Sequence, residues 1–216
     1  MIDPESPSSS PEGNISPLTK LHLLSPVTGG SKFHYGVIML YIVLAFQILV
    51  IAFGVGIHLT RHREDRSGAG FFKAFMPWFL AAGVGFSGVW SFMGHVFLAD
   101  ETAKSIGWAA GNPFQFEVAM ANLSYGVLGF LCLRYHGKFW WATVLAYTVF
   151  LWGAAYGHIY ELIVNNNHEP GNAGFVLYAD IITPLLLIAL LIIYGKVAAK
   201  EPAAGDIPVP APASTG

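Results

Sequence analysis

Residues 173–194 read AGFVLYADIITPLLLIALLIIY, an apolar stretch interrupted by a single charged side chain, Asp180. A helix needs roughly 20 apolar residues to cross a hydrocarbon layer about 30 Å thick. The stretch therefore predicts a membrane-spanning helix. Similar apolar stretches precede it at residues 35–59, 75–98, 116–133 and 139–164. We expect an all-α membrane protein, a bundle of five transmembrane helices.

The composition agrees with this fold class. Of 216 residues, 54% are hydrophobic and only 11% are charged, whereas soluble domains carry about a quarter charged residues. The net charge of −2 and the lack of long basic tracts predict a lipid bilayer as partner and no nucleic acid. Cys132 is the single cysteine, which excludes an intrachain disulfide and a thiolate metal cage.

The two ends of the chain differ from the middle. Residues 1–34 are rich in Ser, Pro and Gly, and residues 197–216 are rich in Pro and Ala. Such compositions predict disordered tails on either side of a transmembrane domain at 35–196. The N-terminal segment has no basic start followed by an apolar core, so we do not expect a cleavable signal peptide.

Positively charged residues predict the orientation, because they are enriched in cytoplasmic loops. Eight of the eleven Lys and Arg residues fall on one side of the predicted bundle: Arg61, Arg63, Arg66, Lys73, Arg134, Lys138, Lys196 and Lys200. We expect this side to be cytoplasmic, with the N-terminus outside and the C-terminus inside. The predicted location is the cell membrane, the inner membrane of a prokaryote.

Small residues recur inside the predicted spans, at Gly83, Gly85, Gly88, Gly126, Gly129, Gly153 and Gly157. Small residues let helix backbones approach closely within a bilayer. We expect these glycines to pack helices within the bundle. The alternative for Gly153 and Gly157 is a contact with a second copy of the chain or with another membrane subunit.

Ionisable side chains concentrate near the predicted outer ends of the spans. With a rise of 1.5 Å per residue, five of them fall within roughly 10 Å of the outer boundary: His95, Glu117, His158, Glu161 and Asp180. Further polar residues at this level are Asn122, Asp100, Glu101 and Asn172. Apart from His58, the cytoplasmic half has no equivalent. Since a charge in hydrocarbon costs several kcal/mol, we expect the five to point inward and contact one another.

Three interpretations of this layer remain open. Imidazole and carboxylate groups are ligands for zinc, iron or manganese, although the paired Glu-x-x-His motifs of di-iron bundles are missing. Haem between His95 and His158 is disfavoured by the surrounding carboxylates. A mixed His and carboxylate cluster would also exchange protons or handle a substrate. Hydrogen-bonded pairs that fix the helix register are the third interpretation.

The predicted function is correspondingly broad. We expect a small integral membrane protein, an accessory or structural component whose outward-facing polar site binds a metal or a small molecule. A membrane-embedded metal-dependent enzyme and a small proton-coupled transporter are the alternatives. The sequence contains neither a nucleophile motif nor a phosphate-binding glycine loop, so we do not expect an enzyme.

Residues 116–129 read FEVAMANLSYGVLG, and this string resembles a family of prokaryotic multi-pass membrane proteins catalogued only as a domain of unknown function. The matching features are Glu117, the Ala-Asn-Leu triplet at 121–123, Gly126, Gly129, the segment 100–107, His158 and Asp180. The resemblance covers roughly residues 75–195. It implies an integral membrane protein and no assigned activity.

Overall fold

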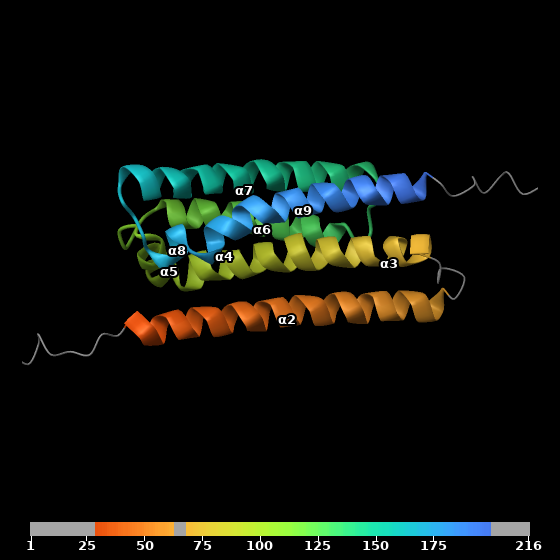
Figure 1. Cartoon of the computed structure of the whole chain (residues 1–216), viewed down its shortest axis with the longest axis horizontal. Coiled ribbons are helices and arrows are strands. Elements are labelled where there is room, and N and C mark those ends of the chain that lie inside the picture. Colours follow the sequence, from red (N-terminus) through yellow and green to blue (C-terminus); the bar gives the residue numbers. More distant parts are fainter. Residues whose placement is uncertain (1–28, 63–67, 200–216) are drawn as a thin grey trace, which may run out of the picture. The chain divides into compact units, whose positions relative to one another are not determined.

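The computed structural model describes residues 29–62 and 68–199, and within these ranges the chain is helical and contains no strand (Figure 1). The chain divides into two compact units, Met1–Tyr41 and Ile42–Gly216. The described part of the first unit is the beginning of helix α2, which runs Gly29–Arg61 and continues into the second unit.

The second unit contains the other helices. In chain order these are α3 (Gly68–Leu80), the π-helix η2 (Ala81–Phe86), α4 (Ser87–Phe97), α5 (Ala99–Ile106), α6 (Phe114–Leu131), α7 (Lys138–Val164), α8 (Pro170–Ala173) and α9 (Phe175–Ala198). Within it α4 packs along α6, and α7 packs along α9. Figure 1 shows both pairs.

Four helical stretches among the described residues are long and apolar enough to cross a membrane: Tyr41–Arg61, Gly68–Phe97, Lys138–Val164 and Pro170–Ala198. The prediction of a multi-pass helical membrane protein is therefore confirmed. The predicted third span corresponds to α6, which is helical but is not one of the four. Gln115, Glu117 and Asn122 in its first half lower its hydropathy.

The predicted second span begins seven residues too late, because its helix starts at Gly68. Pro77 lies in the interior of this helix. Proline removes a backbone donor and disturbs the preceding turn, and the wider η2 follows directly after α3. The side-chain amide of Gln47 in α2 donates to the Ala82 carbonyl at 3.2 Å and to Ser87 Oγ at 2.8 Å. It thereby supplies a partner for a backbone carbonyl of the π-helix.

The hydrophobic core of the second unit lies between α3, η2, α7 and α9. Along α7 its members recur every three or four residues, as a helix face requires: Trp140, Val144, Tyr147 and Leu151. The opposite face of α7 exposes large apolar side chains, including Val149 at 74% and Ile163 at 75%. An apolar surface of this kind suits a lipid environment.

Glycines explain the close approach of η2 and α4 to α6. A Cβ added to Gly88 would lie 2.5 Å from the Asn122 carbonyl oxygen, and Gly85 and Gly129 face each other in the same way. This part of the packing prediction is confirmed. It is wrong for Gly83, Gly153 and Gly157, because an added Cβ at each would meet no described atom within 4 Å. Gly153 and Gly157 are also exposed.

The predicted tails, 1–34 and 197–216, lie outside the described residues except at their inner edges. There, α2 already begins at Gly29 and α9 ends at Ala198.

Candidate functional site

Three of the predicted polar residues meet between α7, α8 and α9. His158 Nε2 lies 3.7 Å from Asp180 Oδ2, and His158 Nδ1 lies 2.8 Å from Asn172 Oδ1. Their positions follow from helical spacing, since His158 comes three residues after buried Ala155 and Asp180 three residues after buried Leu177. The inner faces of α7 and α9 therefore bring the imidazole and the carboxyl group together.

Asn172 determines how the His158 ring is protonated. The Asn172 Nδ2 group donates to two backbone carbonyls, of His158 at 3.2 Å and of Asn167 at 2.9 Å. Its Oδ1 is therefore the acceptor, so His158 Nδ1 must carry the hydrogen. The remaining ring nitrogen, Nε2, faces Asp180. The distance of 3.7 Å between Nε2 and Asp180 Oδ2 is longer than a hydrogen bond, so the two groups are neighbours without a direct hydrogen bond.

Asn167 extends this arrangement to the helix that follows α4. Its Nδ2 donates to the carbonyl of Ile106 in α5 at 2.8 Å. We call the group formed by His158, Asn167, Asn172 and Asp180 the His158 network. It joins α5, α7, α8 and α9 at one end of the second unit.

Glycines allow α8 and the loop before it to contact the end of α5. Gly107 has φ +86°, the left-handed conformation that ends a helix, and an added Cβ would lie 2.6 Å from Asn167 Nδ2. At Gly171 an added Cβ would lie 2.7 Å from the Ser105 carbonyl oxygen. The His158 network is therefore held by backbone packing as well as by hydrogen bonds.

His95 belongs to a separate pair. Its Nδ1 lies 2.5 Å from Gln115 Oε1, which joins α4 to the first turn of α6. Gln115 is buried, whereas Glu117 is exposed. The buried positions of α6 recur every three or four residues at 115, 119, 122, 126 and 129, and Glu117 falls between them. Gln115 is therefore the inward-facing polar residue of this turn.

The five ionisable residues predicted to touch one another form a single direct pair among the described contacts, His158 and Asp180. Glu161, one turn beyond His158, instead accepts a hydrogen bond from Asn165 Nδ2 at 2.9 Å. Within the part of the chain that the structure describes, no three His, Cys, Asp or Glu side chains are grouped as metal ligands. The metal interpretation therefore gains no support from this geometry.

Comparison with known proteins agrees with the resemblance of the 116–129 segment. The sequence profile of DUF6790, a family of unknown function, matches residues 39–200. The chain belongs to this family. The match begins in the first apolar stretch, so the likeness extends further towards the N-terminus than residue 75. Searches of curated proteins and of solved structures found no match.

The other polar residues predicted for this DUF6790 protein have local partners or face outward. Asn122 Nδ2 donates to the Val118 carbonyl at 2.9 Å, one turn earlier in α6. Asp100 Oδ1 accepts from the Gly111 N–H at 2.9 Å, and Glu101 is exposed. These contacts stabilise individual turns and add no ligand to the His158 network.

Two residues of this DUF6790 protein matter more than the sequence suggested. Neither Asn167 nor Gln115 was among the predicted site residues. For Gln115 a signal existed, because it shares the spacing of Ala119, Asn122 and Gly126 along one helix face. For Asn167 no periodicity applies, since it lies in a loop whose path depends on tertiary packing.

Proposed function

We propose that the protein is a small accessory or structural component of a cell membrane, in which the polar layer holds helix ends together and binds no metal. The proposal rests on the contacts that the polar atoms of the His158 network make. Nδ1 of His158 bonds to Asn172, and Nε2 faces Asp180. One carboxyl group, that of Asp180, lies near Nε2, and among the described residues no third ligand joins this pair, whereas zinc sites use at least three protein ligands.

We also propose that α6 is the fifth span. Ile106 closely follows α4 and Asn167 closely follows α7, so the hydrogen bond between them supports placing the ends of α4 and α7 on the same side of the membrane. A helix of 27 residues is about 40 Å long, which supports a start of α7 on the opposite side. The chain must then cross between Ile106 and Lys138, and α6 is the long helix in that interval.

The distribution of basic residues supports an orientation for these spans. Arg61 ends α2, Arg134 and Lys138 lie at the junction of α6 and α7, and Lys196 lies in the last turn of α9. With this side cytoplasmic, the His158 network faces outward, and the expected location is the inner membrane of a prokaryote.

Cysteine labelling of intact cells tests this orientation. Asn166→Cys places an exposed thiol beside the His158 network, and Arg134→Cys places one at the other end of α7. A membrane-impermeant maleimide is expected to label Asn166→Cys and to leave Arg134→Cys unlabelled until the cells are opened. The reverse pattern would contradict the orientation, and equal labelling at both positions would contradict α7 as a span.

Metal analysis combined with thermal unfolding tests the structural role. Detergent-purified protein is expected to hold no stoichiometric zinc, iron or manganese, and His158→Ala is expected to lower its unfolding temperature. A full equivalent of metal that is lost in His158→Ala would instead support the metal-dependent enzyme. Unchanged stability in His158→Ala without any metal would leave the structural role without a basis.

One observation favours proton transfer as a second candidate. The hydroxyl of Thr148 is buried and has no hydrogen-bond partner among the described residues, and it lies on the inner half of α7, which the sequence led us to expect to be apolar. Ten residues separate it from His158, about 15 Å along the helix. Proton flux into liposomes containing the protein, abolished by Asp180→Asn and reduced by Thr148→Val, would favour this candidate over a structural role.

A further inference from the structure

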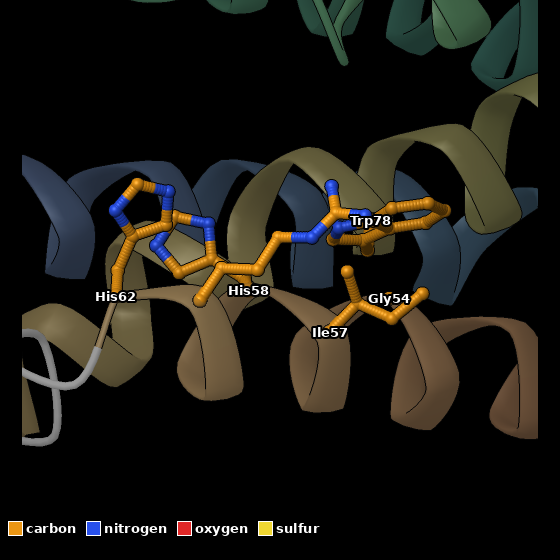
Figure 2. A pocket seen from close by; sticks show the side chains of 6 residues that line it. Gly54, Ile57, His58, His62 and Trp78 are labelled. Carbon is orange, nitrogen blue, oxygen red and sulfur yellow. The ribbon is translucent and has the colours of Figure 1, made fainter.

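A cavity of about 190 Å³ lies between the C-terminal turns of α2 and the C-terminal turn of α3, far along the chain from the His158 network. It is lined by Gly54, Ile57, His58, Arg61, His62 and Trp78. Figure 2 shows His58 and His62 side by side on α2, with Trp78 of α3 beside Gly54, further along α2. Both walls belong to the second unit of the chain.

The spacing of the cavity residues places their basic groups on one helix face. His58, Arg61 and His62 are related by three and four positions, so they lie on one side of α2. The ring centroids of His58 and His62 are 4.8 Å apart. Trp78 packs so closely on Gly54 that an added Cβ would collide with the indole ring. This glycine therefore seats the tryptophan that forms the other wall.

The basic side chains of the cavity are not needed as hydrogen-bond partners for the carbonyls of Ile57 and His58, at the C-terminal end of α2. Cationic side chains at a helix C-terminus often stabilise its last carbonyls. Here the Ile57 carbonyl accepts from Thr60 Oγ1 at 2.9 Å, and the His58 carbonyl accepts from the His62 N–H at 2.9 Å. Two of the terminal carbonyls thus have local partners. The guanidinium of Arg61, which lines the cavity, is not required for them.

The chemistry of the lining selects an anion with several oxygen atoms. Arg61 carries a permanent positive charge and N–H donors, and Trp78 adds the N–H group of its indole ring. Among the residues of 29–62 and 68–199, no carboxylate lines the cavity. The permanent charge of Arg61 disfavours a metal ion between His58 and His62. A phosphate group matches these donors in charge and geometry.

The position of the cavity indicates where the phosphate would come from. The first candidate span, Tyr41–Arg61, ends at this cavity, and the headgroups of the bilayer begin where a span ends. We propose that the cavity binds a phosphate group, and that this group belongs to the headgroup of an anionic phospholipid. The site is independent of the role of the His158 network.

The test measures the unfolding temperature of the full-length protein in a neutral detergent. Phosphatidylglycerol, phosphatidylcholine and inorganic phosphate are titrated separately. Phosphatidylglycerol is expected to stabilise the protein, and phosphatidylcholine at the same concentration is not. Stabilisation by inorganic phosphate at equal concentration would assign the site to a free anion and would contradict the lipid source. No effect of either phosphatidylglycerol or inorganic phosphate would overturn the site altogether.

Two variants localise the effect. Arg61→Gln is expected to weaken the apparent affinity for phosphatidylglycerol about tenfold, since charge-assisted hydrogen bonds to phosphate are lost. Arg134→Gln removes an exposed arginine elsewhere in the second unit and serves as the matched control. Equal weakening in both variants would show general charge attraction and overturn the proposal. His62→Gln, at an exposed position, gives the same comparison if Arg61→Gln does not fold.

Discussion

Replacing Asn172 by alanine removes the residue on which the His158 network depends. Asn172 is fully buried, with 0% exposure. Its side chain makes three hydrogen bonds, to the His158 ring at 2.8 Å, to the His158 carbonyl at 3.2 Å and to the Asn167 carbonyl at 2.9 Å. In Asn172→Ala these three partners are partly shielded from solvent and each loses a bonding group. The free energy of unfolding should therefore fall.

The size of this effect follows from the number of bonds. A hydrogen bond contributes about 0.5–1.5 kcal/mol net in a folded protein, and about 0.6 kcal/mol on average between helices in a membrane. Three bonds therefore correspond to a loss of about 2–4 kcal/mol, with the unsatisfied, partly shielded groups favouring the upper value. For a chain of this length, such a loss lowers the unfolding temperature by roughly 5–15 °C.

Tryptophan fluorescence during heating in one detergent measures this shift. Asn165→Ala is the matched control, because Asn165 is exposed and its side chain makes one hydrogen bond, to Glu161. An exposed substitution of this kind is expected to change stability by less than about 0.5 kcal/mol. If Asn172→Ala shifted the unfolding temperature no more than Asn165→Ala does, the reasoning from the three hydrogen bonds would be refuted.

Two further predictions concern packing. Gly88→Ala is expected to destabilise the protein by about 1–3 kcal/mol, because the added Cβ has no room against α6. Gly153→Ala, in open space, should be neutral or slightly stabilising. Equal shifts of the two variants in thermal unfolding would contradict this difference. Trp140→Phe removes a buried hydrogen bond of 2.9 Å to the Cys132 carbonyl and should cost about 1–3 kcal/mol in chemical unfolding. Exposed Trp141→Phe should cost little, and a larger loss there would be inconsistent with the packing.

Much of the fold could be predicted because apolar length and helical period act locally. The apolar stretch at 139–164 matches α7 to within one residue at its start, since lipid-facing and core-facing residues are both hydrophobic along it. The second span was less predictable. The residues before Pro77 are helical, although proline is usually found in the first turn of a helix. Tertiary contacts outweigh such a single local preference.

The candidate site was predictable only in part. The estimated depth of each residue in its span correctly predicted that His158 lies near Asp180, because both are near the same end of adjacent helices. Depth alone could not tell which side of a helix a residue occupies, so Glu117 was included although it is exposed. The pairing of His95 with Gln115 depends on how α4 crosses α6. That crossing is set by glycine contacts between helices, which no local pattern specifies.

A double-mutant cycle on His158 and Asp180 tests the central claim most directly. Unfolding free energies are measured for the original protein, His158→Ala, Asp180→Ala and the double variant, in metal-free buffer. The two groups lie 3.7 Å apart, and residues in contact are coupled by roughly 0.5–3 kcal/mol. We predict that the double variant loses about 1 kcal/mol less than the sum of the single losses. Strict additivity of the two losses would contradict the claim that this pair holds α7 and α9 together.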